Sequence, residues 1–180
     1  MNLISVIKGE VHDIKNKLLG KSIQSLKYDI HVQNIHTKSI CFLTELSDKR
    51  IATCCYDKSI SIVSLDYQTK TWKQDILKVN THESGVTSLC ELNKDRLITS
   101  SGDHTIKIWN ITLKELKPLL KLTNYTDYVY KVIPLNNNKF CSCSNDKTVK
   151  IWNSESYKVL ISLQHNDSVD DLLKPQQNNF

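Results

Sequence analysis

The feature that most constrains this chain is an internal repeat with a period of forty-odd residues. The segment Ser100–Asn110 (SSGDHTIKIWN) recurs as Cys143–Asn153 (CSNDKTVKIWN), and a weaker copy occupies Cys54–Ser64 (CCYDKSISIVS). Each copy carries one aspartate, and the three stand 46 and 43 residues apart: Asp57, Asp103 and Asp146. Self-similarity at this period predicts a fold of repeated structural units that stack on one another.

Further matching positions precede each copy. A β-branched residue lies 17 residues before each aspartate, and these residues are Ile40, Val86 and Val129. Four residues earlier lies a histidine or, once, a tyrosine: His36, His82 and Tyr125. His165 and Val169 begin a fourth copy. The register predicts units at about 36–78, 82–122, 125–163 and the start of another at 165–175.

Each unit has the pattern of short strands. Thr105–Trp109 and Thr148–Trp152 alternate, with β-branched and aromatic residues enriched, and turn signals precede them at 101–103 and 144–146. Short, evenly spaced strands with this period predict the blades of a β-propeller, each a four-stranded antiparallel sheet. We therefore expect an all-β arc of three full blades, with partial blades at both ends.

The repeat resembles the WD-repeat (WD40) family over roughly residues 27–175. That family ends its third strand with Trp-Asp, and this chain has Trp109-Asn110 and Trp152-Asn153. The resemblance implies a partial WD40 β-propeller over 26–175. It also implies a buried hydrogen-bond network, made by a histidine, a hydroxyl, the turn aspartate and the tryptophan. Matched position gives its members as His36, Thr53, Asp57, His82, Thr99, Asp103, Trp109, Ser142, Asp146 and Trp152.

Two units depart from the family pattern. Val63 stands where the first unit should have tryptophan, and Tyr125 stands where the third should have histidine. We expect shorter networks and less rigid blades there. The residue types also match those of a hydrolase triad. A scaffold residue repeats with its unit, however, whereas an active site usually occurs once. We therefore predict that the chain is not an enzyme and binds no cofactor.

Composition narrows the choice of partner and compartment. The net charge of +5 is nearly all lysine, and the scarcity of arginine argues against sequence-specific nucleic-acid binding. The six cysteines form no CxxC pair, so we expect buried thiols and no metal site. No apolar run approaches the roughly 20 residues that span a bilayer, and no secretory signal is recognisable. These features predict a cytoplasmic or nuclear protein that is not secreted.

The two ends of the chain differ from the repeat. Apolar residues at heptad spacing predict an amphipathic helix within residues 1–25: Ile4, Ile7, Val11, Ile14 and Leu18. That helix either packs on the propeller edge or forms a coiled coil, and both alternatives stay open. Residues 26–33 read as the outer strand of a preceding blade, and residues 176–180 as a disordered tail.

The predicted arc is too short to close alone, because propellers need about 4–8 blades. Its end blades would expose apolar flanks, which favours association. Three explanations are open: the sequence is a fragment of a longer chain, two copies join, or a second protein completes the ring. We expect the first of these.

Function is expected to lie on the face formed by the loops that join consecutive units and by the turns before the aspartates. In the family this face most often binds peptides or partner domains, so we predict a protein-interaction scaffold. The candidate contact residues are Lys38, Tyr56, Tyr128 and Asn145. The alternative is an RNA-binding or anionic-lipid-binding module that uses the lysine-rich surface, and its binding would weaken steeply with salt.

Overall fold

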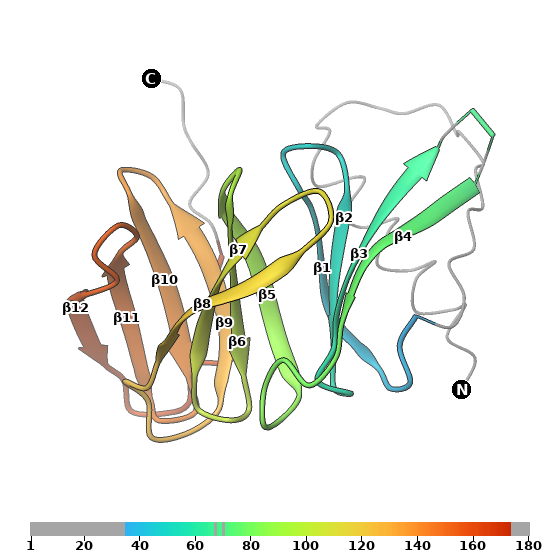
Figure 1. Ribbon diagram of the computed structural model, residues 1–180. Helices are drawn as coiled ribbons and strands as arrows, with labels where there is room; N and C mark the ends of the chain where they lie inside the picture. Colours follow the sequence, from blue (N-terminus) through green and yellow to red (C-terminus); the bar gives the residue numbers. More distant parts are fainter. Residues whose placement is uncertain (1–34, 67, 70, 174–180) are drawn as a thin grey trace, which may run out of the picture.

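The computed structural model describes residues 35–66, 68–69 and 71–173 (Figure 1). The predicted helix within 1–25, the predicted strand over 26–33 and the predicted tail at 176–180 lie outside the described residues. Every regular element of the described part is a β-strand, which confirms the all-β prediction. Nowhere in that part does the chain form a helix long and apolar enough to cross a membrane.

Twelve strands form three four-stranded antiparallel sheets, each built from consecutive strands. Blade one contains β1 (Ile40–Glu45), β2 (Ile51–Cys55), β3 (Ile60–Asp66) and β4 (Thr71–Lys78). Blade two contains β5 (Val86–Asn93), β6 (Arg96–Ser101), β7 (Ile106–Ile111) and β8 (Leu116–Leu122). Blade three contains β9 (Val129–Leu135), β10 (Lys139–Ser144), β11 (Thr148–Asn153) and β12 (Val159–Gln164). The three full blades expected from the repeat are therefore present.

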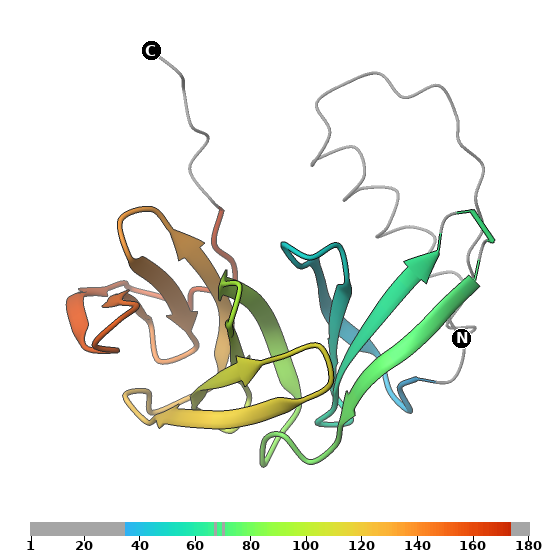
Figure 2. The same cartoon turned by 45° about the horizontal axis from the view of Figure 1, so that its top comes forward.

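The sheets stand side by side and fan outward. The first strands of the blades are neighbours, because β1 packs beside β5 and β5 beside β9. The last strands, β4, β8 and β12, lie on the outside of the arc (Figure 2). Each sheet has a bulge between its third and fourth strands at the same position of the repeat: after Ile62, Ile108 and Ile151. The shared register shows that one local construction is used three times.

Alternation along β7 explains how a blade packs on both neighbours. Ile106 and Ile108 face blade three and are fully buried there, in a core that includes Phe140. Trp109 and Ile111 point to the opposite face and join the core shared with blade one. Successive side chains of a strand point to opposite faces of its sheet, so one strand serves two interfaces. The arc therefore has a separate apolar core at each junction.

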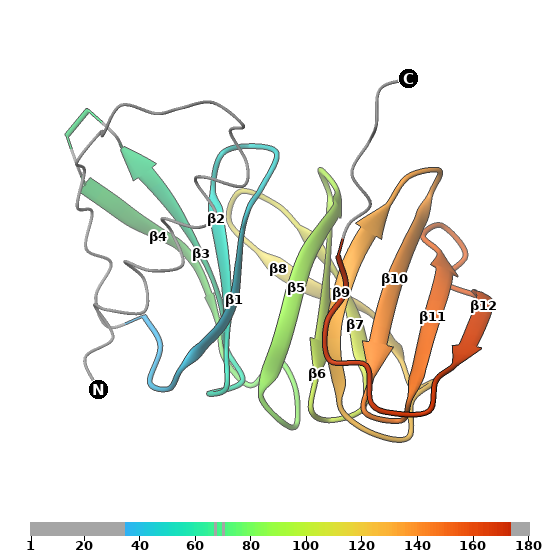
Figure 3. The same cartoon turned by 180° about the vertical axis from the view of Figure 1, so that it is seen from behind.

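The described part of the fourth unit, residues 165–173, forms no strand. It runs along blade three (Figure 3), where the Val169 N–H donates to the Ser144 carbonyl at 3.2 Å. Val169 and Leu172 pack against a small core that contains Cys143. The expected first strand of a fourth blade is thus absent here, because this segment contacts the face of blade three and pairs with no strand among the described residues.

The outer part of that face is open to solvent. Leu163 of β12 is 48% exposed, whereas Leu122, at the matching position of β8, is 8% exposed under blade three. The position of Ile161, also 48% exposed, is less regular, since its counterpart is 7% exposed in blade one (Ile76) and 40% exposed in blade two (Leu120). The same position is therefore core in one blade and surface in another.

The cysteines behave as small core residues. Burial raises the pKa of Cys54 well above its ordinary value and raises that of Cys143 to about 12. Both thiols stay protonated at physiological pH, which makes them poor nucleophiles and poor metal ligands.

Candidate binding face

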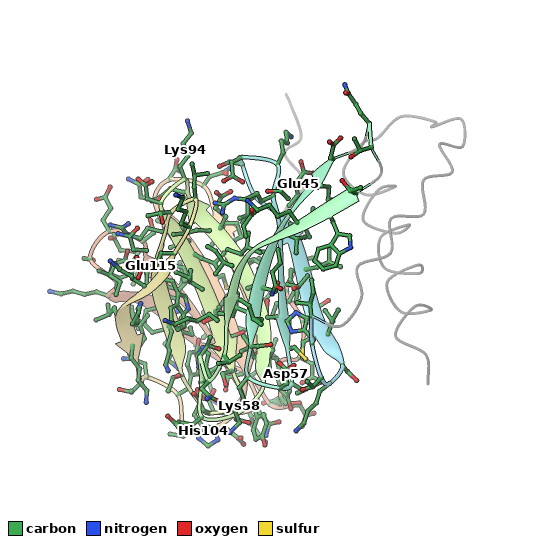
Figure 4. The ribbon with its side chains drawn as sticks, turned by 45° about the vertical axis from the view of Figure 1, so that its right-hand side comes forward. Glu45, Asp57, Lys58, Lys94, His104 and Glu115 are labelled. Carbon is green, nitrogen blue, oxygen red and sulfur yellow. The ribbon has the colours of Figure 1, made fainter. Side chains whose placement is uncertain are left out.

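The connections between blades and the turns between second and third strands gather at one end of the sheets. We call this end the turn face and define it as residues 36–39, 56–58, 81–85, 102–104, 125–128 and 145–147. Figure 4 shows Asp57, Lys58 and His104 at this end, whereas Glu45 and Lys94 lie at the opposite end. All the residues predicted to contact a partner lie on the turn face.

Each turn on this face depends on its aspartate. The residue after the aspartate has a left-handed backbone, with φ near 70° in all three blades: Lys58, His104 and Lys147. Such a conformation is unfavourable for a residue with a side chain. The aspartate offsets it by accepting the backbone N–H two residues later, at 3.0 to 3.1 Å, from Ser59, Thr105 and Thr148. The aspartate also accepts the N–H of a residue in the connection between blades: Thr37, Glu83 and Thr126. It therefore ties the turn to the preceding loop.

Blade two contains a continuous hydrogen-bond network. His82 Nδ1 lies 2.9 Å from Asp103 Oδ2, and His82 Nε2 lies 2.8 Å from Thr99 Oγ1. The Trp109 indole N–H donates to the same hydroxyl oxygen at 2.9 Å. A neutral imidazole with its proton on Nδ1 satisfies every contact, because it donates to the carboxylate and accepts from the threonine hydroxyl. All four residues predicted for this blade are in the network.

Burial and hydrogen bonding set the charges of this network. Burial lowers the pKa of His82 and outweighs the opposing effect of Asp103. Burial alone would raise the pKa of Asp103, but hydrogen bonds from His82 and Thr105 hold it well below its ordinary value. The pair is therefore an ionised carboxylate and a neutral imidazole at neutral pH. Neither side chain is more than 5% exposed, so the pair is held away from solvent.

Blade one connects its histidine to its aspartate through a different set of hydrogen bonds. His36 Nδ1 lies 3.7 Å from Asp57, too far for a hydrogen bond, and contacts the Ser59 hydroxyl at 2.7 Å instead. Ser59 in turn donates to Asp57, while His36 Nε2 lies 2.8 Å from Thr53. Val63 has no donor to extend the chain beyond Thr53. Compared with the network of blade two, this one has an additional serine between the histidine and the aspartate, and it lacks the indole at its core end.

Blade three has two separate networks. The Tyr125 hydroxyl lies 2.5 Å from Ser142 Oγ, and the Trp152 N–H donates to that oxygen at 2.6 Å. Asp146 accepts from the Thr148 hydroxyl at 2.6 Å. No hydrogen bond between the described residues joins Asp146 to Tyr125. We expected a shorter network in this blade, and the structure shows one that is interrupted between Tyr125 and Asp146.

Lys150 lies at that break. Its Nζ donates to Thr148 Oγ1 at 2.6 Å and lies 4.2 Å from the centre of the Tyr125 ring. Burial lowers the pKa of Lys150, and Asp146 opposes that effect. A cation over an aromatic face is favourable by up to about 2 kcal/mol when desolvated. Lys150 thus replaces a direct contact between Tyr125 and Asp146.

Sequence reasoning missed the hydroxyl two residues after each aspartate: Ser59, Thr105 and Thr148. Each donates to its aspartate, and Ser59 also connects it to the histidine. The signal was present, since Asp-x-Ser/Thr occurs in all three copies of the repeat. It was read as the first residue of a strand and not as part of the turn.

The four candidate contact residues differ in how freely they are displayed. Lys38 is exposed, and Tyr56 and Tyr128 are 54% and 45% exposed. Asn145 is half-buried and tied down, because its Nδ2 donates to Asp127 at 2.6 Å. The structure therefore places two aromatic rings and one cation at the surface, and gives Asn145 a supporting position.

One group of possible metal ligands occurs among the described residues. Potential ligand atoms of His36, Cys55 and Asp57 lie within 4.8 Å of one another. These atoms are already used in hydrogen bonds: both imidazole nitrogens contact hydroxyls, and the Cys55 sulfur accepts the Asp57 N–H at 3.4 Å. The arrangement fits a hydrogen-bonded turn better than a metal centre.

Three antiparallel blades of this construction define a β-propeller arc. Residues 73–110 and 116–153 match the family model described as WD domain, G-beta repeat. Each match runs from the last strand of one blade through the first three strands of the next. The described residues thus form a partial propeller that contains two WD40 repeats.

Solved structures share this propeller fold. The RRP9 WD40 repeats superpose with a TM-score of 0.69 at 22% identity, over 82% of this chain and 46% of theirs. U3-55K gives 0.63 at 22% identity, over 74% and 42%. The WD40 β-propeller domain of Doa1 gives 0.60 at 20% identity, over 74% and 42%. This chain thus spans less than half the length of each. Comparison with curated proteins gives no match.

Proposed function

We propose that the chain is a protein-interaction scaffold, without chemistry of its own, that binds a peptide or a partner domain on the turn face. Its setting is the cytoplasm or the nucleus. The WD40 fold supports the general role, because propellers of this family generally serve as non-catalytic scaffolds. The choice of face rests on how residues are distributed among equivalent positions of the three blades.

The observation that carries the proposal is a division between repeated and unrepeated positions. The positions of His82, Thr99, Asp103 and Thr105 hold similar residues in each blade, and those residues are wholly or partly buried and hydrogen-bonded. Neighbouring positions on the turn face vary. The residue before the aspartate, for example, is Tyr56, Gly102 or Asn145. Repeated residues build the turns, so the unrepeated ones are free to specify a partner.

A catalytic role fits the same observation poorly. The His82–Asp103 pair lies beneath the surface, and Thr99, the hydroxyl it would activate, is fully buried. Thr99 also accepts the Trp109 N–H, which fixes it within the core. A nucleophile must reach its substrate, and this one does not.

Matched charge reversals test the choice of face. Lys38→Glu changes the turn face, and Lys94→Glu makes the same change at the opposite end. Each full-length variant is used to purify bound proteins from the cell of origin, with melting temperature as a check on folding. We expect Lys38→Glu to lose partners that Lys94→Glu retains. Equal losses, or a loss with Lys94→Glu alone, would contradict the proposal. A steep loss of binding with salt in both would favour a polyanion.

A further inference from the structure

One cluster on the turn face occurs at a single junction. It lies between blades two and three and contains His104, Asp127, Tyr128 and Asn145 of the turn face, together with Tyr130 of β9. The equivalent residues at the junction of blades one and two are Lys58, Ser84, Gly85, Thr87 and Gly102. That junction therefore has no carboxylate and no aromatic ring at these positions. Because repeated residues build the scaffold, the scaffold does not require this unrepeated set.

Hydrogen bonds hold the centre of this cluster in place. Asp127 accepts the Tyr128 backbone N–H on Oδ1 at 2.7 Å and the Asn145 side chain on Oδ2 at 2.6 Å. Asn145 Oδ1 accepts the Tyr130 hydroxyl at 3.2 Å. Each carboxylate oxygen can accept two hydrogen bonds, so each keeps capacity for one more. The Asp127 side chain is 39% exposed, and its remaining capacity is accessible to a ligand.

The Tyr128 ring is positioned beside this carboxylate. It lies over Gly102, where an added Cβ would come within 2.5 Å of a ring carbon. The His104 ring is 5.7 Å away, centre to centre, and tilted by 47°. The ring is confined by a glycine and an imidazole, yet Tyr128 remains 45% exposed. One aromatic surface thus stays available next to an anchored anion.

The charge of Asp127 determines the ligand class. The Tyr128 N–H and then the Asn145 amide lower its pKa, so the carboxylate is ionised throughout the physiological range. The nearest described side chain that can carry positive charge is His104, whose Nε2 lies 3.9 Å from Oδ1. The ligand that matches an ionised carboxylate beside an aromatic ring is a cation.

We infer that Asp127 and Tyr128 form an anchor site for an arginine side chain of a bound peptide. The inference rests on the proposed function and names the chemistry of its ligand. Arginine fits better than lysine because its planar fork can donate to both free acceptor positions of the carboxylate at once. The same plane can stack on the tyrosine ring, whereas an ammonium group contacts the site as a point charge.

The probe is a set of labelled short-peptide pools with random flanking residues and one fixed central residue. That residue is arginine, lysine or citrulline, which has the shape of arginine without its charge. Binding to the full 180-residue chain is measured by fluorescence polarisation. We expect the arginine pool to bind about tenfold more tightly than the citrulline pool, with lysine between them.

Variants assign the binding to the site. Asp127→Asn removes the charge but keeps acceptor oxygen for Tyr128, and Tyr128→Leu removes the ring. Each should reduce the arginine preference about tenfold. Tyr128→Phe should retain it. Glu83→Gln, which removes an exposed carboxylate elsewhere on the same face, is the matched control and should change nothing. Melting curves identify any variant that fails to fold.

The outcomes separate this inference from the proposed function. Equal binding of the arginine and citrulline pools, or an arginine preference that survives Asp127→Asn, would overturn the arginine site. A lysine pool that binds as tightly as the arginine pool would overturn the choice of arginine. If no pool binds but Lys38→Glu still loses captured partners, the arginine site is wrong and the turn face remains the proposed binding surface. If Lys38→Glu also has no effect, both fail.

Discussion

Blades two and three have the same strands, register and turn, yet differ in how each is held together. In blade two, Trp109, Thr99, His82 and Asp103 form one network from the core to the surface. In blade three the corresponding network is broken, and Lys150 lies at the break. The backbone is nevertheless equivalent in both. The turn therefore depends on the aspartate and the hydroxyl after it, while the histidine connects that turn to the core.

The two blades also differ in what covers them. Blade three packs over the face of blade two that points away from blade one. On blade three, residues 165–173 cover only the inner part of the corresponding face. At one position of the repeat, the leucine of blade two (Leu122) is therefore buried, whereas the leucine of blade three (Leu163) is half exposed. Local sequence cannot produce that difference, because it depends on the presence of a neighbouring blade.

The largest effect we predict comes from that leucine. Leu122→Ala should cost about 3 kcal/mol of unfolding free energy, because it leaves a cavity between two blades. Leu163→Ala should cost less than about 1 kcal/mol, because the side chain is already half in water. Urea unfolding followed by tryptophan fluorescence measures both. Similar losses would mean that β12 is covered in solution, and sedimentation would then reveal the association.

A second comparison concerns the turn aspartates. Asp103→Ala should destabilise the chain by about 1 kcal/mol more than Asp57→Ala, since it leaves buried His82 Nδ1 with only the Thr105 hydroxyl, at a long 3.4 Å. In blade one, Ser59 remains as the partner of His36 after the aspartate is lost. Thermal melting of the two variants provides the test, and equal losses in melting temperature would contradict it.

The third prediction concerns pH. Because the pKa of His82 is lowered in the folded chain, the unfolded chain binds more protons as pH falls through about 6.5. Stability conferred by the neutral imidazole is present above that pH and is lost below it, by up to about 0.7 kcal/mol between pH 7 and 6. Asp103, whose pKa is also lowered, adds a second loss only below about pH 4.

His82→Gln sharpens this comparison, because glutamine does not titrate. The variant should be less stable at pH 7, but its stability should fall less between pH 7 and 6 than that of the parent chain. His36, whose pKa is lowered by burial, keeps part of the slope in both proteins. Parallel curves for parent and variant would contradict this, because they would mean that His82 binds protons equally in the folded and unfolded chains.

These comparisons also show what the sequence could predict. The period, the strands and the family follow from local patterns that recur, such as Thr105–Trp109 and Thr148–Trp152. The network of blade two followed as well, because all its members match the family pattern. The break at Tyr125 was expected only as a weakening. The position of Lys150 between Tyr125 and Asp146 depends on which partners its flexible side chain can reach. The spacing of residues in the sequence does not reveal this.

The candidate contact residues were harder to predict, since exposure depends on the neighbouring blade. Tyr56 and Asn145 occupy the same position of the repeat, yet one is displayed and the other supports Asp127. Asp127 itself was not predicted, because one aspartate in a loop has no pattern. Apart from the adjacent Tyr128 N–H, its partners are Ser144 and Asn145, 17 and 18 residues away in sequence, and His104 of blade two, and only folding brings these together.

The smallest predicted effect compares two tyrosine–glycine pairs that join neighbouring blades. Tyr56 of blade one lies over Gly85, and Tyr128 before blade three lies over Gly102. Neither glycine has a left-handed backbone, so each is needed for space and not for its φ angle. A Cβ at Gly85 would meet the Tyr56 ring at 2.5 Å and also its Cα at 3.0 Å, whereas the three atoms nearest to one at Gly102 all belong to side chains.

Gly85→Ala should therefore cost about 0.5 kcal/mol more than Gly102→Ala, because a backbone atom yields less readily than a ring. For peptide binding the order should be reversed, with the larger effect from Gly102→Ala. Gly102→Ala displaces the Tyr128 ring from Asp127 and should weaken the arginine preference, while Gly85→Ala leaves that junction intact. Melting temperatures and peptide binding, measured on the same samples, test both halves. If Gly102→Ala cost more stability and left binding unchanged, the Tyr128 ring would be a packing element and not a contact surface.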